Sequence, residues 1–434
     1  MRISKLIILF AGILLLTACV KKENINKNDS SFWNKNAKFS QSEEVLKKEI
    51  ENKIEKLKSY LTENQYEAML ITQVRNFNWV TAGIAHNQIV LNKDVGAASL
   101  LILKNGEKYL LCSGSESGRL MDETLGKLGY KLLQYNWYES NPVKDVRGKM
   151  LRSVVPKGTI ASDVAFPETK LDAGAIKALR LTLSDSELER YRWVNQQTTE
   201  AIQEVCKKIK PGMNEYEIEA ITSAEIRARG IFPTVLLTAV DERIYNYRHA
   251  LPGGAVLKKY AMINVCAEKW GMPVAVTRFV HFGELDKELK NKIEQCAIVN
   301  SKYQQATKPN TASLEVFEGC KKWYAEAGFE GEWKKHHQGG AIGYDDREWV
   351  IYPRIKEMMY NRQAFAWNPT ITGAKVEDTI FITENGFEVL TKAADWPYII
   401  VELDGKKYPQ PTILIRDAKT LEVVKKEDYI IKAN

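Results

Sequence analysis

The segment at residues 184–187, with the sequence Ser-Asp-Ser-Glu, divides this chain into two parts with different patterns. A serine followed three residues later by a glutamate forms a capping box, in which each side chain satisfies a free backbone N–H at the start of a helix. We therefore predict a long helix that begins after Ser184 and runs towards Lys210, where Pro211 and Gly212 end it. A second helix is predicted from Glu215 to Gly230.

The part before the capping box alternates between helical and extended patterns. Residues 43–64 carry apolar side chains near a spacing of 3.6, which predicts a helix. Short apolar runs at 68–71, 99–103 and 109–111 predict strands, and the stretches 116–128 and 142–154 are predicted as helices. This alternation is typical of an α/β domain, with bounds of about 42–180.

The part after the capping box has a different order of elements. Beyond its first two helices, strands are predicted at 234–238, 260–266 and 274–280, and helices at 286–305 and 313–328. Further strands are predicted at 365–367, 379–383 and 398–403. Helices followed by antiparallel-looking strands indicate an α+β domain.

The first residues predict an exported protein. Arg2 and Lys5 precede an apolar run at 6–16, which is too short for a stable membrane span, and the run ends in Leu-Thr-Ala before Cys19. This resembles the bacterial lipobox, so we expect residues 1–18 to be a signal peptide and Cys19 to be lipidated; the alternative is a plain secretory signal. Residues 19–41 are rich in Lys, Asn and Ser, which predicts a flexible tether to the cell envelope.

The net charge bears on the kind of binding partner, and the cysteines bear on disulfide formation. The net charge of +7 arises from 62 basic and 55 acidic residues, without a dense basic block, so no nucleic-acid partner is expected. Of the 6 cysteines, removal of Cys19 leaves an odd number at wide spacings. A disulfide stays open in an oxidising compartment, but buried thiols are the favoured interpretation.

Three segments, in order, resemble the pita-bread family, which includes aminopeptidase P, proline dipeptidase, methionine aminopeptidase and creatinase. They are KIKPGMNEYEI at 208–218, Tyr-Arg-His at 247–249, and VEDTIFIT at 376–383. The resemblance covers about 185–395. It implies an α+β fold in which a pita-bread domain (181–395) follows a smaller creatinase-type α/β N-terminal domain (42–180), with a C-terminal strand extension at 396–434. It also implies a homodimer.

The family's hydrolases usually hold two divalent metal ions with two Asp, one His and two Glu residues, because bridging carboxylates bring two hard cations together. The matching positions of this chain retain only Glu377. The other four are Asn264, Ala275, Gly340 and Asn368. Amide oxygens bind divalent ions weakly. We therefore predict no metal ligand set and no cofactor; the alternative is a shifted loop that brings His336 or His337 to the metal.

These replacements predict a neutral to cationic pocket where the relatives are acidic. Arg347 stands in place of a second family histidine, and a ligand carboxylate held by Arg347 or Arg278 is one interpretation. Internal pairing is the other, joining Arg278 to Glu377 and Arg347 to a neighbouring acidic residue. We assign substrate-binding roles to Arg347, Arg278, Asn264, Asn368 and Glu348.

His249 matches the family histidine that binds substrate in the peptidases and is catalytic in creatinase, which needs no metal. Together with Glu377 it is predicted as a catalytic pair that exchanges protons near neutral pH. The alternative is a structural remnant. His86, His281 and His336 carry no motif and are predicted to be structural.

Three functions follow from this sequence. The first is a membrane-anchored, metal-independent hydrolase or lyase that acts on or binds a small C–N compound or peptide. The second is a non-catalytic pseudo-peptidase that binds such a ligand, and the third is an atypical Xaa-Pro aminopeptidase. Fold resemblance alone does not decide among them, because function depends on the site.

Overall fold

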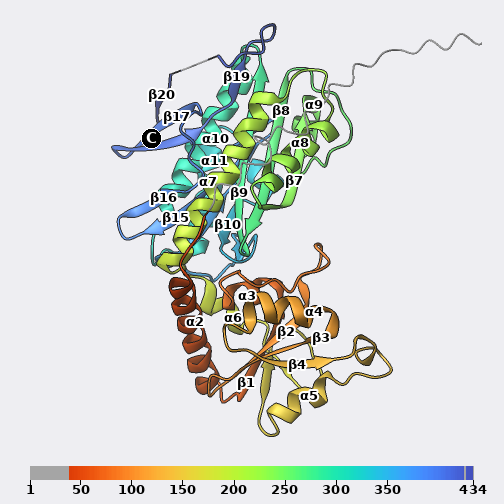
Figure 1. The fold of residues 1–434 in the computed structure, drawn as a ribbon. Helices are drawn as coiled ribbons and strands as arrows, with labels where there is room; N and C mark the ends of the chain where they lie inside the picture. Colours follow the sequence, from red (N-terminus) through yellow and green to blue (C-terminus); the bar gives the residue numbers. More distant parts are fainter. Residues whose placement is uncertain (1–38, 425–426, 434) are drawn as a thin grey trace, which may run out of the picture.

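The computed structural model describes residues 39–424 and 427–433. The predicted signal peptide, Cys19 and most of the predicted tether lie outside the described residues. Figure 1 shows two domains, a smaller one formed by the first part of the chain and a larger one formed by the rest. Within the described residues, no helix is long and apolar enough to cross a membrane.

The first domain is built on a six-stranded sheet in the order β4-β3-β2-β1-β5-β6. Its strands are β1 (Ala68–Gln73), β2 (Val95–Leu103), β3 (Lys108–Ser113), β4 (Lys131–Tyr135), β5 (Ile160–Ser162) and β6 (Lys170–Leu171). Its helices are α2 (Glu43–Glu63), α3 (Val74–Val80), α4 (Gly114–Leu120), α5 (Arg147–Val154) and α6 (Ala175–Arg180), with short turns η1 (Met121–Leu125) and η2 (Trp137–Glu139). The predicted α/β pattern is therefore present.

Both faces of this sheet are buried. Successive side chains of a strand point to opposite faces, so a strand of consecutive apolar residues contributes to a core on each side. In β1, Met69 and Ile71 belong to the large core shared with α2, whereas Ala68 and Leu70 pack in a separate small core with Leu151 of α5. The predicted helix at 142–154 begins only at Arg147. The reason is local: the Asn141 side chain accepts hydrogen bonds from the amides of Val143 and Lys144 and holds a turn there.

The capping box at Ser184 is present as predicted, and it opens α7 (Asp185–Lys208). The larger domain continues with α8 (Glu215–Ala228), α9 (Glu242–Asn246), α10 (Lys287–Ala306), α11 (Ser313–Glu326) and the short turn η3 (Glu332–Lys335). Its long strands are β7 (Phe232–Val240), β8 (Tyr260–Lys269) and β9 (Met272–Phe282). The later strands are β10 (Gly339–Ile342), β11 (Trp349–Val350), β12 (Ala364–Trp367), β13 (Thr370–Ile371), β14 (Ala374–Lys375), β15 (Asp378–Thr383), β16 (Gly386–Val389), β17 (Tyr398–Leu403), β18 (Lys406–Pro411), β19 (Leu414–Arg416) and β20 (Tyr429–Lys432).

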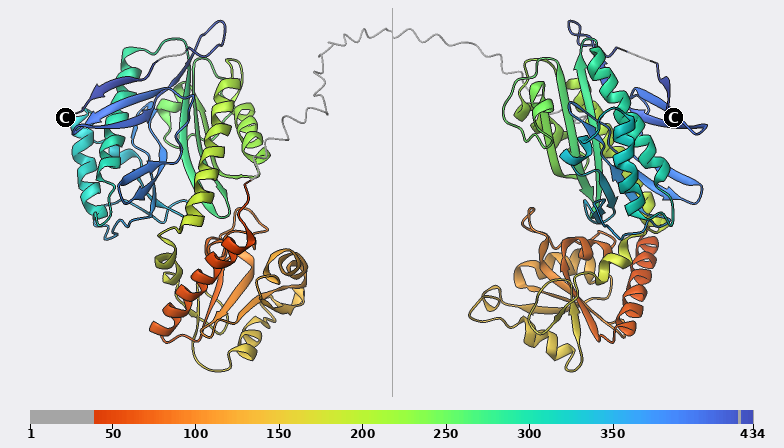
Figure 2. Two further views of the ribbon diagram at one scale, coloured as in Figure 1. Left: turned by 60° about the vertical axis from the view of Figure 1, so that its left-hand side comes forward. Right: turned by 180° about the vertical axis from the view of Figure 1, so that it is seen from behind.

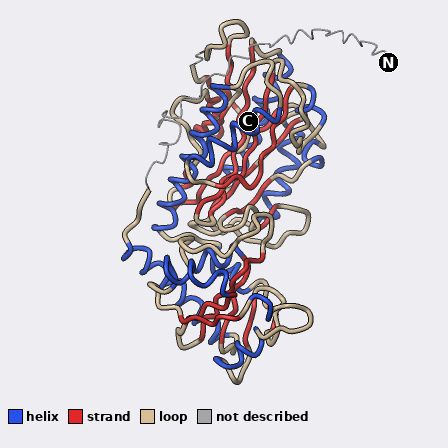
Figure 3. The backbone as a smooth tube through the Cα atoms, turned by 45° about the vertical axis from the view of Figure 1, so that its right-hand side comes forward, coloured by secondary structure: helices blue, strands red, loops and turns tan. Residues whose placement is uncertain are grey.

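Two main sheets of the larger domain meet where the candidate site lies. One has the order β19-β9-β8-β7 and the other β11-β10-β12-β15-β16. They are joined at β9 and β15, where the Thr379 hydroxyl donates to the carbonyl of Ala275 and accepts from its amide, both at 3.0 Å. The helices flank these strands (Figure 2), and the strands run through the middle of the domain (Figure 3). The predicted extension at 396–434 is not separate, because β19 pairs with β9.

A buried ion cluster fixes the two domains together. Lys53 of α2 lies 2.6 Å from Glu49 and 2.7 Å from Glu187, the capping-box residue of α7. Its ammonium also donates to the Tyr344 hydroxyl at 3.2 Å. Arg190 pairs with Glu49 at 2.7 Å, with both side chains only 2% exposed. Because these charges are compensated away from water, separating the domains would leave several of them unpaired.

An aromatic cluster lies at the beginning of the described chain, close to the end of the predicted tether. The ring of Phe39 lies 6.0 Å from that of Trp193 and 5.4 Å from that of Trp270. The two tryptophans are themselves 5.3 Å apart, and Lys269 lies over both rings. This fixes the point at which the chain enters the folded part.

The five cysteines among the described residues are all free thiols. Four of them are buried and Cys266 is half-buried. This agrees with the interpretation of the cysteines as core residues. The fate of Cys19 lies outside the described residues.

Candidate functional site

The carboxylate of Glu377 is the centre of the site. Glu377 lies between β14 and β15, is 1% exposed, and reaches across to β8 and β9. Its Oε2 accepts from Asn264 Nδ2 and from the Thr277 hydroxyl, both at 2.6 Å. Asn264 also donates to the Thr277 hydroxyl at 2.7 Å, so these three side chains form a closed hydrogen-bonded group.

Two cations flank this carboxylate. Lys375 Nζ lies 3.3 Å from Oε2 of Glu377, and Arg347 Nη2 lies 3.5 Å from Oε1. The Lys375 side chain is 6% exposed and that of Arg347 is 20% exposed. Sequence analysis missed Lys375, although its spacing of two residues from Glu377 in an extended segment was a signal that both side chains share one face.

Glu377 remains ionised in this environment. Burial alone would raise the pKa of Glu377, but the nearby charges of Lys375 and Arg347 and the Thr277 hydrogen bond lower it below its ordinary value. One carboxylate is thus faced by two cations. The immediate surroundings of Glu377 therefore have a positive balance.

Arg347 has donors that the protein does not use. Its Nη1 donates to the carbonyl of Asp346 at 2.8 Å, but its contact with Glu377 is long and its buried Nε has no partner. A buried guanidinium N–H without an acceptor costs free energy, so such donors normally find a partner. Asn368, 2% exposed, likewise has an Oδ1 atom without a partner.

Two predicted ligand-binding residues have other contacts. Arg278 is buried, donates to Asp378 at 2.9 Å and to the carbonyl of Thr391 at 2.8 Å, and has no exposed side-chain surface. The carboxylate of Glu348 is held by two hydrogen bonds from Arg180 of the first domain, at 2.5 and 3.0 Å. The expected pairing of Arg278 with the Glu377 side chain is replaced by the ion pair with Asp378. These surroundings favour structural roles for Arg278 and Glu348 over the predicted ligand contacts.

His249 lies in a cluster of three histidines. Its Nε2 is 2.8 Å from Nε2 of His336, and the rings of His336 and His337 stack at 4.3 Å. His249 therefore hydrogen-bonds to His336 instead of forming the predicted direct pair with Glu377. His336, predicted to be structural, contacts His249 from 87 residues away, a contact that the sequence pattern did not predict.

All three imidazoles are neutral at neutral pH. Burial, together with the charge of Lys375, lowers the pKa of His336 to about 2. Burial and the charge of Arg347 lower the pKa of His337 to about 4. Burial, with a smaller effect of Lys375, also lowers the pKa of His249.

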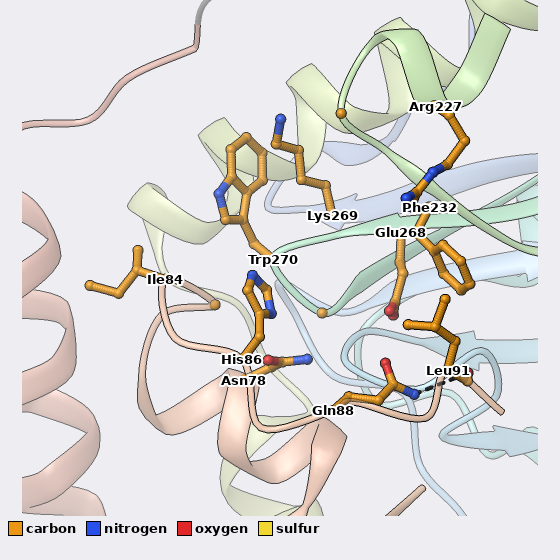
Figure 4. A pocket seen from close by; sticks show the side chains of 13 residues that line it. Asn78, Ile84, His86, Gln88, Leu91, Arg227, Phe232, Glu268, Lys269 and Trp270 are labelled. Atoms are coloured by element: carbon orange, nitrogen blue, oxygen red, sulfur yellow. Dashed lines mark hydrogen bonds between the residues drawn. The ribbon is translucent and has the colours of Figure 1, made fainter. Parts of the chain in front are cut away.

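A pocket of about 470 Å³ lies between the domains. Figure 4 shows His86, Gln88 and Leu91 from the first domain facing Glu268 and Trp270 of the second, with Arg227 above them. Burial, together with the nearby acidic groups of Asp346 and Asp345, raises the pKa of Glu268 to about 7.

The strand β8 connects this pocket with the Glu377 group. Asn264, Cys266 and Glu268 are spaced by two residues in a regularly paired stretch, so they share one face of β8. Asn264 and Glu268 are four residue steps apart, which is about 13 Å along a strand. Asp346, which lines an adjoining pocket with Glu268, directly precedes Arg347. The Glu377 group and the interdomain pocket are therefore connected through one face of β8.

The curved antiparallel sheets, the preceding α/β domain and the site at their junction define the class of pita-bread proteins. The model of metallopeptidase family M24 matches residues 189–384. The Xaa-Pro dipeptidase of Pyrococcus horikoshii is 23% identical over 367 residues, which cover 79% of this chain and 97% of the relative.

Solved structures agree with this fold. The prolidase of Pyrococcus horikoshii matches with a TM-score of 0.66 at 18% identity, covering 79% of this chain and 98% of that one. The X-Pro aminopeptidase of Thermotoga maritima matches with a TM-score of 0.62 at 17% identity, covering 81% and 98%. Residues 189–384 thus match metallopeptidase family M24, and most of the chain is similar to Xaa-Pro peptidases. The predicted resemblance and fold class are confirmed.

Proposed function

We propose that this chain is an envelope-anchored member of the Xaa-Pro peptidase family that binds the carboxylate of a small peptide or C–N compound without a carboxylate-bridged pair of metal ions. The observation that carries the proposal is the environment of Glu377. Its carboxylate is neutralised by protein cations, Lys375 and Arg347, at 3.3 and 3.5 Å.

The residues present do not fit a dinuclear metal centre. Such a centre needs several bridging carboxylates, and the matched positions supply only Glu377. At Gly340, a Cβ atom would lie 2.1 Å from the carbonyl oxygen of Trp349, so this backbone leaves no room for a ligand side chain. Divalent ions would also face the charges of Lys375 and Arg347, which already occupy the surroundings of the carboxylate.

The free donors of Arg347 support recognition of an anion. A guanidinium presents its N–H groups in a planar fork that matches a carboxylate. Arg347 is 20% exposed, so a ligand can reach part of its side chain, whereas the unpaired Nε is buried. Lys375 adds a second positive charge at the same carboxylate of Glu377. A peptide C-terminus or an amino-acid carboxylate has the chemistry that this arrangement selects.

His249 favours catalysis as a second function of the same site. It is exposed, its imidazole is neutral, and it shares a hydrogen bond with His336 at 2.8 Å. A neutral histidine in this setting can accept a proton from an attacking water or from the ligand. If His249 acts in this way, the chain is a hydrolase or lyase. If the ligand is bound and not converted, the chain is a binding protein.

A titration of the full chain in detergent tests the anion site. The probes are the dipeptide Gly-Pro, a guanidino acid and the corresponding amides, measured by calorimetry. We expect the acids to bind more than about tenfold more tightly than the amides, and Arg347→Lys to remove most of this preference because lysine lacks the planar fork. The control is Arg192→Met, which alters an exposed ion pair with Glu388. Equal binding of acid and amide, or no binding of any probe, would contradict the proposal.

A second assay separates catalysis from binding. The same probes are incubated with the chain, with and without added Mn²⁺. Turnover without Mn²⁺ that disappears in His249→Ala supports the enzyme. Cleavage of Gly-Pro only when Mn²⁺ is added would contradict independence from a metal pair and would favour an atypical Xaa-Pro peptidase.

Anchoring rests on the sequence around Cys19 alone. The proposed modification is tested by metabolic labelling with a fatty acid and by fractionation of the envelope. Cys19→Ser should lose the label and release the chain from the membrane fraction. Retention of the Cys19→Ser chain in that fraction would contradict lipid anchoring.

A further inference from the structure

The three histidines of the site come from two loops that the protein holds together. His249 follows α9, and His336 and His337 follow η3. One ring nitrogen from each of the three lies within 4.8 Å of the other two, so small movements would bring all three to one metal ion. The bonds from imidazole nitrogen to zinc are about 2.0–2.1 Å, so two such ligands lie no more than about 4 Å apart when bound.

Contacts next to the three histidines hold their two loops together. Arg248, which precedes His249, forms an ion pair with Glu332 of η3 and donates to the Thr372 hydroxyl at 2.8 Å. Glu332 also accepts from the Thr372 amide at 2.9 Å. The residues next to His249 and the turn before His336 are thus joined to each other and to β13 and β14.

A second support fixes the backbone of His336. Gln338, 2% exposed, donates to the carbonyl of His336 at 2.7 Å and accepts from the hydroxyl of Tyr324 at 2.7 Å. Supporting contacts of this kind limit the rearrangement that metal binding requires. Two changes remain necessary: His249 and His336 must give up their mutual hydrogen bond, and His337 must turn from its 3.3 Å contact with the Gly339 amide.

We infer that His249, His336 and His337 form a binding site for a single transition-metal ion of the zinc, nickel or copper type. Imidazole nitrogens suit these ions, whereas manganese and magnesium prefer oxygen. The site is distinct from the positions that match the family's metal ligands, since it uses none of Asn264, Ala275, Gly340, Asn368 and Glu377. It also goes beyond the proposed anion site, which needs no metal.

Three histidines leave one position of a four-coordinate metal ion open. The charges nearby favour certain ligands at that position. Lys375 acts on all three imidazoles and Arg347 on His337, against the opposing charge of Glu377 on His249 and His337, so two positive charges face one negative charge around the ion. An added divalent cation is disfavoured there unless an anion accompanies it. The open position should therefore carry hydroxide or a ligand carboxylate, and carboxylate and metal should bind together.

Titration of the metal-free full chain in detergent with Co²⁺ and Cu²⁺ tests this site. We expect one ion per chain, a four-coordinate Co²⁺ absorption spectrum, and Cu²⁺ resonance spectra with three nitrogen ligands. Replacing His336 or His337 by alanine should weaken binding at least about tenfold, the lower end of the loss seen when groups that only support metal ligands are removed. The control is His86→Ala in the other domain, which should bind as the unaltered chain does. Circular dichroism verifies that each variant is folded.

Two outcomes would overturn the inference. One is stoichiometric binding with oxygen ligands that is unchanged in the His336 and His337 variants. The other is binding no stronger than that of a His249→Ala/His336→Ala/His337→Ala chain. Failure of this test leaves the anion site intact, because Gly-Pro binding to the metal-free chain is measured separately.

Discussion

The ammonium of Lys375 lies 3.3 Å from the carboxylate of Glu377, and both side chains are almost fully withdrawn from water. In a hydrolase with a metal pair, a carboxylate at this position would face metal ions. Here it faces a charge that belongs to the protein. The pair stands at the junction of the two main sheets, so its integrity bears on stability as well as on ligand binding.

Glu377→Gln should destabilise the chain by about 3–5 kcal/mol at pH 7, because it leaves the cation of Lys375 buried without its partner. The pKa of Glu377 is lowered on folding, so its contribution is present above the ordinary carboxyl pKa and is lost as the pH falls through the folded value. The difference in the free energy of unfolding between the two chains, measured in urea, should therefore shrink in acid. Glu377→Gln/Lys375→Met should recover part of the loss. A single variant as stable as the original at pH 7 would show that the pair is not needed.

Arg278→Met should cost about 3–5 kcal/mol of stability, because it strands the buried carboxylate of Asp378. The affinity for Gly-Pro should not change in the folded variant. Urea unfolding and calorimetry check the two parts separately. A selective loss of ligand binding at unchanged stability would restore the predicted ligand role of Arg278.

Glu268 should make stability fall as the pH rises. Its pKa is raised to about 7 on folding, so its contribution is complete below the ordinary carboxyl pKa and disappears as the pH rises through about 7. Glu268→Gln should match the unaltered chain near pH 4.5 and exceed its stability by about 1–3 kcal/mol at pH 8. Thermal unfolding at both pH values measures this. Equal stability at pH 8 would mean that Glu268 ionises at an ordinary pH.

Lys53→Met should weaken the attachment of the two domains, because Glu187 loses its ion pair in the buried interface. The expected loss is about 3–5 kcal/mol, with faster proteolysis in the segment 181–184 between α6 and α7. Lys58→Met is the control on the same helix: its ion pair with Glu55 is exposed and contributes about 1 kcal/mol or less. Equal protease resistance of Lys53→Met and Lys58→Met would argue against a locked interface.

Local patterns predicted much of the fold. The capping box at Ser184 and the bounds of α2, α7 and β17 follow from interactions within a few residues, so the sequence displays them directly. The start of α5 was misplaced because the side chain of Asn141 binds backbone groups that a helix would otherwise use.

The candidate site depends on distant contacts, and there the sequence was less informative. Motif matching located Glu377, Asn264 and Arg347, which the structure brings to one region. It did not find Lys375, because a lysine near a strand is commonly exposed. His336 and His337 carry no periodic signal, and only the pairing of Arg248 with Glu332 brings their loop to His249. The tie between Arg180 and Glu348 also crosses 168 residues, beyond the reach of any local pattern.

The aromatic contact of Phe39 with Trp270 places the beginning of the described chain beside the interdomain pocket. Trp270 lines the interdomain pocket, and Phe39 stands 20 residues after Cys19. Whatever its path, a chain of that length spans at most about 70 Å. If Cys19 carries the proposed lipid, the mouth of the pocket stays within that distance of the bilayer. Its ligands would then be drawn from the thin layer next to the membrane, such as peptides released during turnover of the envelope.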